Sequence, residues 1–105
     1  MAITMLALYK RPEGGDEALA EFRRRYRAEH LPLMAQVPGL RQTVVEEVVQ
    51  HFYGEDIVLV TRMLFDDRAA LDAAMGSDEM RAAGRNLREV APGIVTLLVT
   101  EEASA

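Results

Sequence analysis

The residue in this sequence best suited to acid–base chemistry is His30. It lies one helical turn beyond Tyr26 and two residues before Pro32, which should end or kink its helix because proline cannot donate to the preceding turn. An imidazole has an ordinary pKa of about 6.5, so His30 facing a pocket could act as a general base or acid. The structural alternative is that the ring satisfies carbonyl groups freed by Pro32, or caps the end of the helix.

Three aromatic side chains accompany His30 in the pattern. Phe22 and Tyr26 share its helical stripe, and Tyr9 ends a predicted strand. They could line a ligand pocket, with the Tyr26 hydroxyl orienting the ligand. Core packing is the more common role of aromatic residues at helical spacing. Tyr9 would either rim the same pocket or hold the strand end with its hydroxyl in water.

Arg62 interrupts an otherwise apolar segment. A buried arginine could bind a carboxylate or an enolate. A hairpin would place Glu46 or Glu47 opposite it, and this favours a cross-strand ion pair instead. The adjacent carboxylates of Asp66 and Asp67 resemble a paired acid site, but helix capping explains them better.

Two further polar groups are interpreted as solvent-facing. His51 and Tyr53 fall in a short acidic connection between predicted strands. The arginines at positions 23, 24, 25 and 27 are flanked by Glu21 and Glu29 and spread around a helix, which is typical of a solvated face.

Composition excludes several classes of site. The chain has no cysteine, so disulfides, thiolate nucleophiles and Cys-ligated metals are excluded. Two histidines are too few for the usual His-rich metal centre, and we expect no metal and no bound cofactor. A net charge of −5 argues against nucleic acid, and no apolar run approaches the roughly 18 residues of a membrane span. With no signal-peptide pattern, a cytoplasmic protein is expected.

The 105 residues predict a single domain, 1–105, with residues 1 and 101–105 frayed. Strands are expected over 2–9, 40–49, 57–65 and 94–100. One helix should begin at an Asp16 N-cap, with an apolar stripe that ends at Leu33. Two more should follow caps at Asp66 or Asp67 and at Ser77. The order β-α-β-β-α-β predicts an α+β ferredoxin-like fold, a four-stranded antiparallel sheet with helices on one face.

The apolar pattern of the strands points to a second subunit. The segments 57–65 and 94–99 are apolar on both faces apart from Thr61, Arg62 and Thr96, and the first strand should also be buried on both faces. Helices can cover one face of the sheet. The other would leave an apolar patch that monomers rarely expose. We therefore expect a homodimer in which two sheets pack face to face.

Four runs together resemble the EthD family of the dimeric α/β barrel superfamily. These runs are Tyr9–Gly14 (YKRPEG), Phe22–His30 (FRRRYRAEH), Pro32-Leu33 and Pro38-Gly39-Leu40. The resemblance is densest over residues 5–45 and weaker from there to residue 101. It implies that His30 is the family's helix-borne histidine before Pro-Leu. It also implies an acidic residue in the third helix of many relatives, where this chain has Gly84-Arg85-Asn86.

The resemblance spans ether-degradation cluster proteins, polyketide dehydratases, lactone isomerases and anthrone-type monooxygenases, so it does not choose a reaction. Three hypotheses remain. The first is a cofactor-independent enzyme that binds a small hydrophobic carbonyl compound, with His30 moving a proton in an isomerisation, dehydration or oxygenation. The second is a non-catalytic binding protein that serves a degradation or oxygenase pathway. The third is a haem-binding barrel with His30 as axial ligand.

Overall fold

The strands form an antiparallel sheet in the order β2-β3-β1-β4. A computed structural model describes residues 1–103 of the chain. The strand bounds are β1 (Ile3–Lys10), β2 (Leu40–Glu47), β3 (Ile57–Phe65) and β4 (Val95–Glu101). Strand β1 lies at the centre, paired along its length with β3 and β4.

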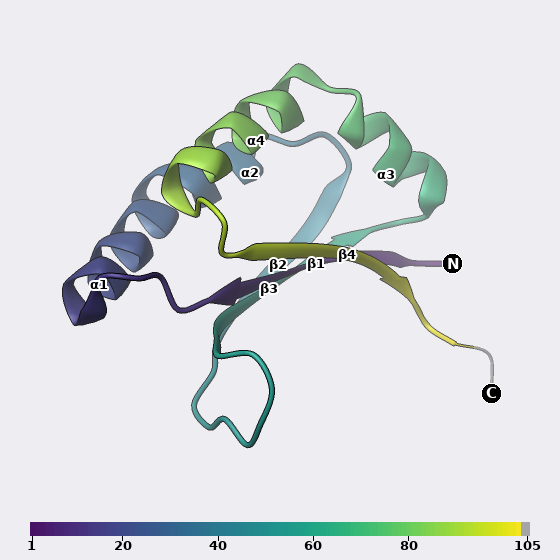
Figure 1. The fold of residues 1–105 in the computed structure, drawn as a ribbon. Helices are drawn as coiled ribbons and strands as arrows, with labels where there is room; N and C mark the ends of the chain where they lie inside the picture. Colours follow the sequence, from purple (N-terminus) through teal and green to yellow (C-terminus); the bar gives the residue numbers. More distant parts are fainter. Residues whose placement is uncertain (104–105) are drawn as a thin grey trace.

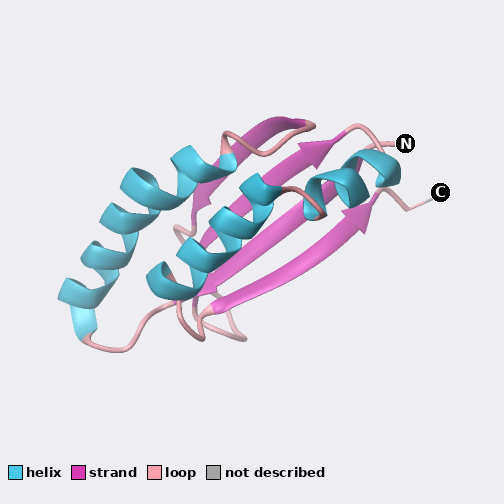
Figure 2. Ribbon diagram, turned by 90° about the horizontal axis from the view of Figure 1, so that it is seen from above, coloured by secondary structure: helices cyan, strands magenta, loops and turns pink. Residues whose placement is uncertain are grey.

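The helices form a second layer on one face of this sheet (Figure 1). The first helical segment runs without a break through α1 (Gly15–Arg25), the π-helical turn η1 (Tyr26–His30) and α2 (Leu31–Met34). The second is split into α3 (Arg68–Met75) and α4 (Asp78–Val90), and α4 lies beside η1 and α2 above the sheet (Figure 2). This is the predicted ferredoxin-like arrangement. No helix within residues 1–103 is long and apolar enough to cross a membrane.

Pro32 neither ends the first helix nor breaks its direction, contrary to expectation. In a regular α-helix its ring would collide with the carbonyl four residues earlier. The wider π turn, in which the Leu31 N–H donates to the Tyr26 carbonyl, places the proline in the first turn of α2 instead. The helix therefore continues, and its buried stripe passes from His30 to Met34, while Leu33 is half-buried.

Helix capping matches the prediction at two of three positions. Asp67 and Ser77 accept hydrogen bonds from the Ala70 and Met80 amides at the starts of α3 and α4. The first helix is capped by Gly14 rather than by Asp16, which lies in its first turn. Gly14 has a φ of 110°, a backbone conformation that side chains disfavour. An added Cβ would also lie 2.9 Å from the Ala18 Cβ, which is a steric clash.

Five predicted strand ends differ from the structure: β1 and β4 each begin and end one residue later than expected, and β2 ends two residues earlier. Strand β2 stops at residue 47, because residues 48–56 leave the sheet as a loop on the face opposite the helices (Figure 1). Glu101 is part of β4 and pairs with Ile3, so the frayed tail was placed one residue too early. Residues 104 and 105 of that predicted tail lie outside the described residues.

The two faces of β1 are buried to different extents. Its helix-side residues are buried, whereas the alternate residues Thr4, Leu6 and Leu8 are half-buried on the open face. The prediction of two buried faces is therefore wrong for a single chain. No helix covers the open face within the described residues, and Leu98 is 44% exposed there.

A chain of buried hydroxyl groups crosses the core. Tyr9 donates to the Tyr26 hydroxyl at 3.1 Å, and Tyr26 bonds the Thr61 hydroxyl at 2.6 Å. All three side chains are at most 1% exposed. Burial raises the pKa of both tyrosines, so they stay protonated as donors. The chain ties the first helix to two strands of the sheet.

We expect Tyr26→Phe to lower the free energy of unfolding by about 1–3 kcal/mol, because it leaves the Tyr9 and Thr61 hydroxyls without their shared partner. Urea unfolding followed by circular dichroism measures this. Tyr53→Phe is the matched control, because Tyr53 is 91% exposed and should change stability by less than about 0.5 kcal/mol. Equal effects of the two substitutions would contradict the buried network.

Candidate functional site

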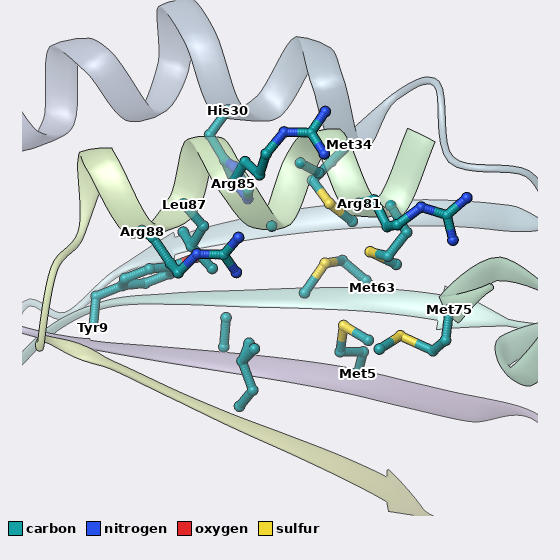
Figure 3. Close-up of a pocket in the computed structure, with 15 residues that line it drawn as sticks. Met5, Tyr9, His30, Met34, Met63, Met75, Arg81, Arg85, Leu87 and Arg88 are labelled. Carbon is teal, nitrogen blue, oxygen red and sulfur yellow. The ribbon is translucent and has the colours of Figure 1, made fainter. Parts of the chain in front are cut away.

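A cavity of about 390 Å³ lies between the helical layer and the sheet. Its walls come from β1, β3 and β4 below and from η1, α2, α3 and α4 above (Figure 3). The volume lies within the ordinary range of small-molecule sites. Methionine dominates the lining, since five of the six methionines of the chain face it: Met5, Met34, Met63, Met75 and Met80.

His30 reaches this cavity from the end of the π turn. The imidazole is 4% exposed and stacks on the Tyr26 ring, with centroids 5.3 Å apart. Its Nδ1 lies 3.2 Å from Oδ1 of Asn86 on α4. Nε2 has no hydrogen-bond partner among the described residues. The ring therefore bonds Asn86 and not the backbone carbonyls freed by Pro32, which was the structural role considered for it.

A polar chain behind His30 determines which ring nitrogen carries the proton. Arg25 holds the Glu29 carboxylate through two nitrogens at 2.9 and 3.1 Å and, by this hydrogen bonding, keeps the pKa of Glu29 low. An ionised carboxylate can accept but not donate. Asn86 must therefore turn its amide NH₂ to Glu29, at 3.1 Å, and its Oδ1 to His30. His30 is then the Nδ1–H tautomer, which leaves the Nε2 lone pair free.

The protonation state of His30 follows from its surroundings. Burial lowers its pKa, and the hydrogen bond to Asn86 opposes this in part. The ring is therefore a neutral imidazole near pH 7, with a basic Nε2 beside an apolar cavity. A neutral imidazole in this state can accept a proton from a bound molecule and return it.

The predicted aromatic residues divide between cavity and core. Tyr9 lines the cavity, and its hydroxyl is buried against Tyr26 rather than in water. Phe22 and Tyr26 do not line it. They pack behind Tyr9, with ring centroids 5.4 and 4.9 Å from its ring, which is the core-packing alternative.

The other polar candidates lie away from the cavity. Arg62 forms an ion pair with Glu46 at 2.9 Å on the open face of the sheet, as the hairpin register predicted. His51 and Tyr53 are exposed in the loop between β2 and β3. The described residues contain no group of three or more His, Asp or Glu side chains that could hold a metal ion.

Helix α4 supplies the groups that the sequence patterns missed. Asn86 orients His30, and Arg85 and Arg88 lie along the cavity wall. Gly84 leaves space in the same wall, because an added Cβ would lie 3.8 Å from an Arg88 nitrogen, an ordinary van der Waals contact. In the sequence, the segment Gly84-Arg85-Asn86 departs from the acidic residue expected in the family. This departure was the one sign that the third helix contributes to the site.

The model of the EthD domain matches residues 15–89, which include η1 and all of α4 but its last residue. The chain belongs to the EthD family. An EthD family protein from Bacillus halodurans C-125 is 34% identical, with a TM-score of 0.85, over 98% of this chain and 100% of that one. The resemblance expected from the four sequence runs is thus confirmed. No curated protein sequence matches the chain significantly.

More distant structures share the fold. A dimeric ferredoxin-like protein of unknown function from Jannaschia sp. CCS1 is 21% identical, with a TM-score of 0.69, over 97% of this chain and 100% of that one. A Dabb family protein from Mesorhizobium loti is 10% identical, with a TM-score of 0.74, over 99% of this chain and 100% of that one. At these identities the likeness concerns the fold alone.

We expect the pKa of His30 to lie below its ordinary value of about 6.5, because burial penalises the imidazolium. Asn86→Ala should lower it further, since the hydrogen bond to Asn86 raises it. The pH titration of the His30 ring signals by NMR measures both values.

The same shift has a consequence for stability. With a lowered pKa in the folded state, the unfolded chain binds the proton more readily, so His30 makes the fold less stable as pH falls below about 6.5. A His30 pKa above 6.5, or one raised in Asn86→Ala, would contradict this account of the site.

Proposed function

We propose that this EthD family protein binds a small hydrophobic carbonyl compound in the cavity and that His30 transfers a proton next to the carbonyl group. The observation that carries the proposal is the chain Arg25–Glu29–Asn86–His30. It holds the imidazole in one tautomer, and the ring lines the cavity with Nε2 free of hydrogen bonds within the described residues. A ring with a merely structural role would not need a carboxylate and an amide to select its tautomer.

The reaction that this arrangement supports is general-base catalysis. Nε2 would remove a proton from the carbon next to the carbonyl and return it elsewhere, as an isomerisation or dehydration requires. The burial of the ring favours a neutral base over an imidazolium. Asn86 would act as a positioning residue, since it touches His30 and not the ligand.

Two alternatives use the same cavity. A non-catalytic binding protein would hold the carbonyl compound without converting it. A haem-binding protein would use Nε2 as an axial ligand, and haemin added to the purified chain would then give a Soret band that His30→Ala abolishes.

Proton transfer is tested with 2-tetralone, a bicyclic ketone with exchangeable protons next to its carbonyl. We expect the protein to accelerate exchange of these protons in D₂O, followed by NMR, and His30→Ala to reduce the acceleration by about 100-fold or more. His51→Ala is the matched control, because the other histidine of the chain lies in an exposed loop and should leave the rate unchanged.

A third variant shows whether exchange occurs in the cavity. Gly84→Leu should place a side chain in the open wall and abolish both binding and exchange, while the helix is retained. Acceleration that persists in His30→Ala would contradict the mechanism. Binding of 2-tetralone without exchange would favour the non-catalytic binding protein.

We also propose that the chain is a homodimer joined through the open face of the sheet. Relatives of the same fold are described as dimeric ferredoxin-like proteins. The open face carries an apolar centre from Leu6, Leu8, Val60 and Leu98, which a single chain leaves in water. The loop on this side also exposes apolar side chains, with Val49 94% and Phe52 80% exposed. A second copy would cover both.

We expect sedimentation equilibrium at micromolar concentration to give about twice the chain mass of 11.7 kDa. Leu6→Asp should shift the mass to that of one chain, because it buries a charge at the centre of the proposed interface. Ala20→Asp, on the exposed side of α1, is the matched control and should stay dimeric. A wild-type monomer, or a dimer unaffected by Leu6→Asp, would contradict this interface.

A further inference from the structure

Two arginines of the cavity wall have no carboxylate partner. Of the eleven arginines in the chain, eight form ion pairs within residues 1–103, and Arg68, Arg85 and Arg88 form none. Arg85 and Arg88 both line the cavity. Acidic residues outnumber basic ones by 17 to 12, so partners are plentiful in the chain. Arg85 and Arg88 nevertheless have no carboxylate partner within residues 1–103.

The nearby carboxylates are engaged elsewhere. Glu29 is held by Arg25 and Asn86, and Glu89 lies 4.0 Å from Arg25. Asp78 is paired with Arg81, the third arginine of the wall. The α4 segment Gly84-Arg85-Asn86, where many relatives are expected to carry an acid, has none, and the group that contacts His30 there is the neutral amide of Asn86.

Arg85 and Arg88 both belong to the α4 wall of the cavity. They are three residues apart on α4, and this spacing places side chains next to each other on a helix. Figure 3 shows both arising from α4 above the space that the methionines and Tyr9 surround. Guanidinium groups pair with carboxylate oxygens better than with neutral groups, so two arginines on one wall favour an acidic ligand.

The opposite wall has a different chemistry. Met5 and Met63 on the sheet, and Met34 above them, present thioether side chains that repack easily around an apolar body. The cavity therefore combines an adaptable apolar floor with an unpaired cationic wall. That combination fits a molecule with one acidic end and one apolar end.

We infer that the ligand of this cavity is an apolar organic acid, whose acidic group is held by Arg85 and Arg88 and whose body lies against the methionines beside His30. This inference rests on the proposed function, because it names the class of molecule that the same cavity takes. A neutral ketone could contact the methionines and His30 but would form no ion pair with Arg85 or Arg88.

The test compares two probes of the same size and different charge, naphthalene-2-carboxylate and 2-naphthylmethanol, by isothermal titration calorimetry with the full chain. We expect the carboxylate to bind about tenfold or more tightly. Replacing both arginines, Arg85→Gln with Arg88→Gln, should remove this preference and leave the affinity for the alcohol unchanged. Raising the salt concentration should weaken binding of the carboxylate alone.

Two controls accompany the double variant. Arg68→Gln removes the third unpaired arginine, which does not line the cavity, and should preserve the preference. Gly84→Leu should abolish binding of both probes by filling the open wall. Glutamine is a good helix former, so the double variant should keep its helix content by circular dichroism.

The outcomes separate the two proposals. Equal affinity for the two probes, or a preference that survives the double substitution, overturns the acid-binding inference and leaves the proposed function standing. Absence of binding by both probes at about millimolar concentration, or binding that persists in Gly84→Leu, overturns both.

Discussion

The hydrogen bond between His30 and Asn86 joins the two helical segments that roof the cavity. Its direction depends on the charge of Glu29, because this ionised carboxylate accepts from Asn86 and so turns the amide oxygen toward the imidazole. Arg25 in turn holds Glu29. One ion pair at the surface of the helical layer thereby sets the tautomer of a buried ring. The tautomer and the orientation of the imidazole follow from that arrangement, whereas its neutral state follows from burial.

The π turn is the backbone counterpart of this hydrogen bond. A regular α-helix would not accommodate Pro32 in its interior, and a helix ended by it would leave His30 at a frayed terminus. The π turn keeps the helix continuous to Met34, so His30 projects from an ordered segment with Tyr26 stacked beneath it. Single π turns are frequent at functional sites for this kind of reason. The position of the imidazole is thus fixed by the backbone of η1 and by the hydrogen bond to Asn86.

The element order was predictable from the sequence, because strands and helices here differ clearly in periodicity and in their turn residues. Strand β3 was predicted at both ends, and the caps at Asp67 and Ser77 were identified by residue type. The π turn was not predictable, since proline within a helical pattern usually marks an end. Asn86 was missed for another reason. Its contact with His30 joins residues 56 positions apart, and such pairing depends on how two helices pack.

One residue of the cavity wall, Gly84, lowers the stability of the helix that contains it. Gly84 in the interior of α4 costs helix stability relative to alanine by roughly 1 kcal/mol. A small domain has little stability to spare and buries a modest fraction of its surface. Alanine or leucine at this position would improve the helix and fill the space, yet the chain leaves it open beside His30. Natural sequences break local rules chiefly where a site requires it. The open wall, the methionines and the oriented imidazole therefore support the binding site that we propose.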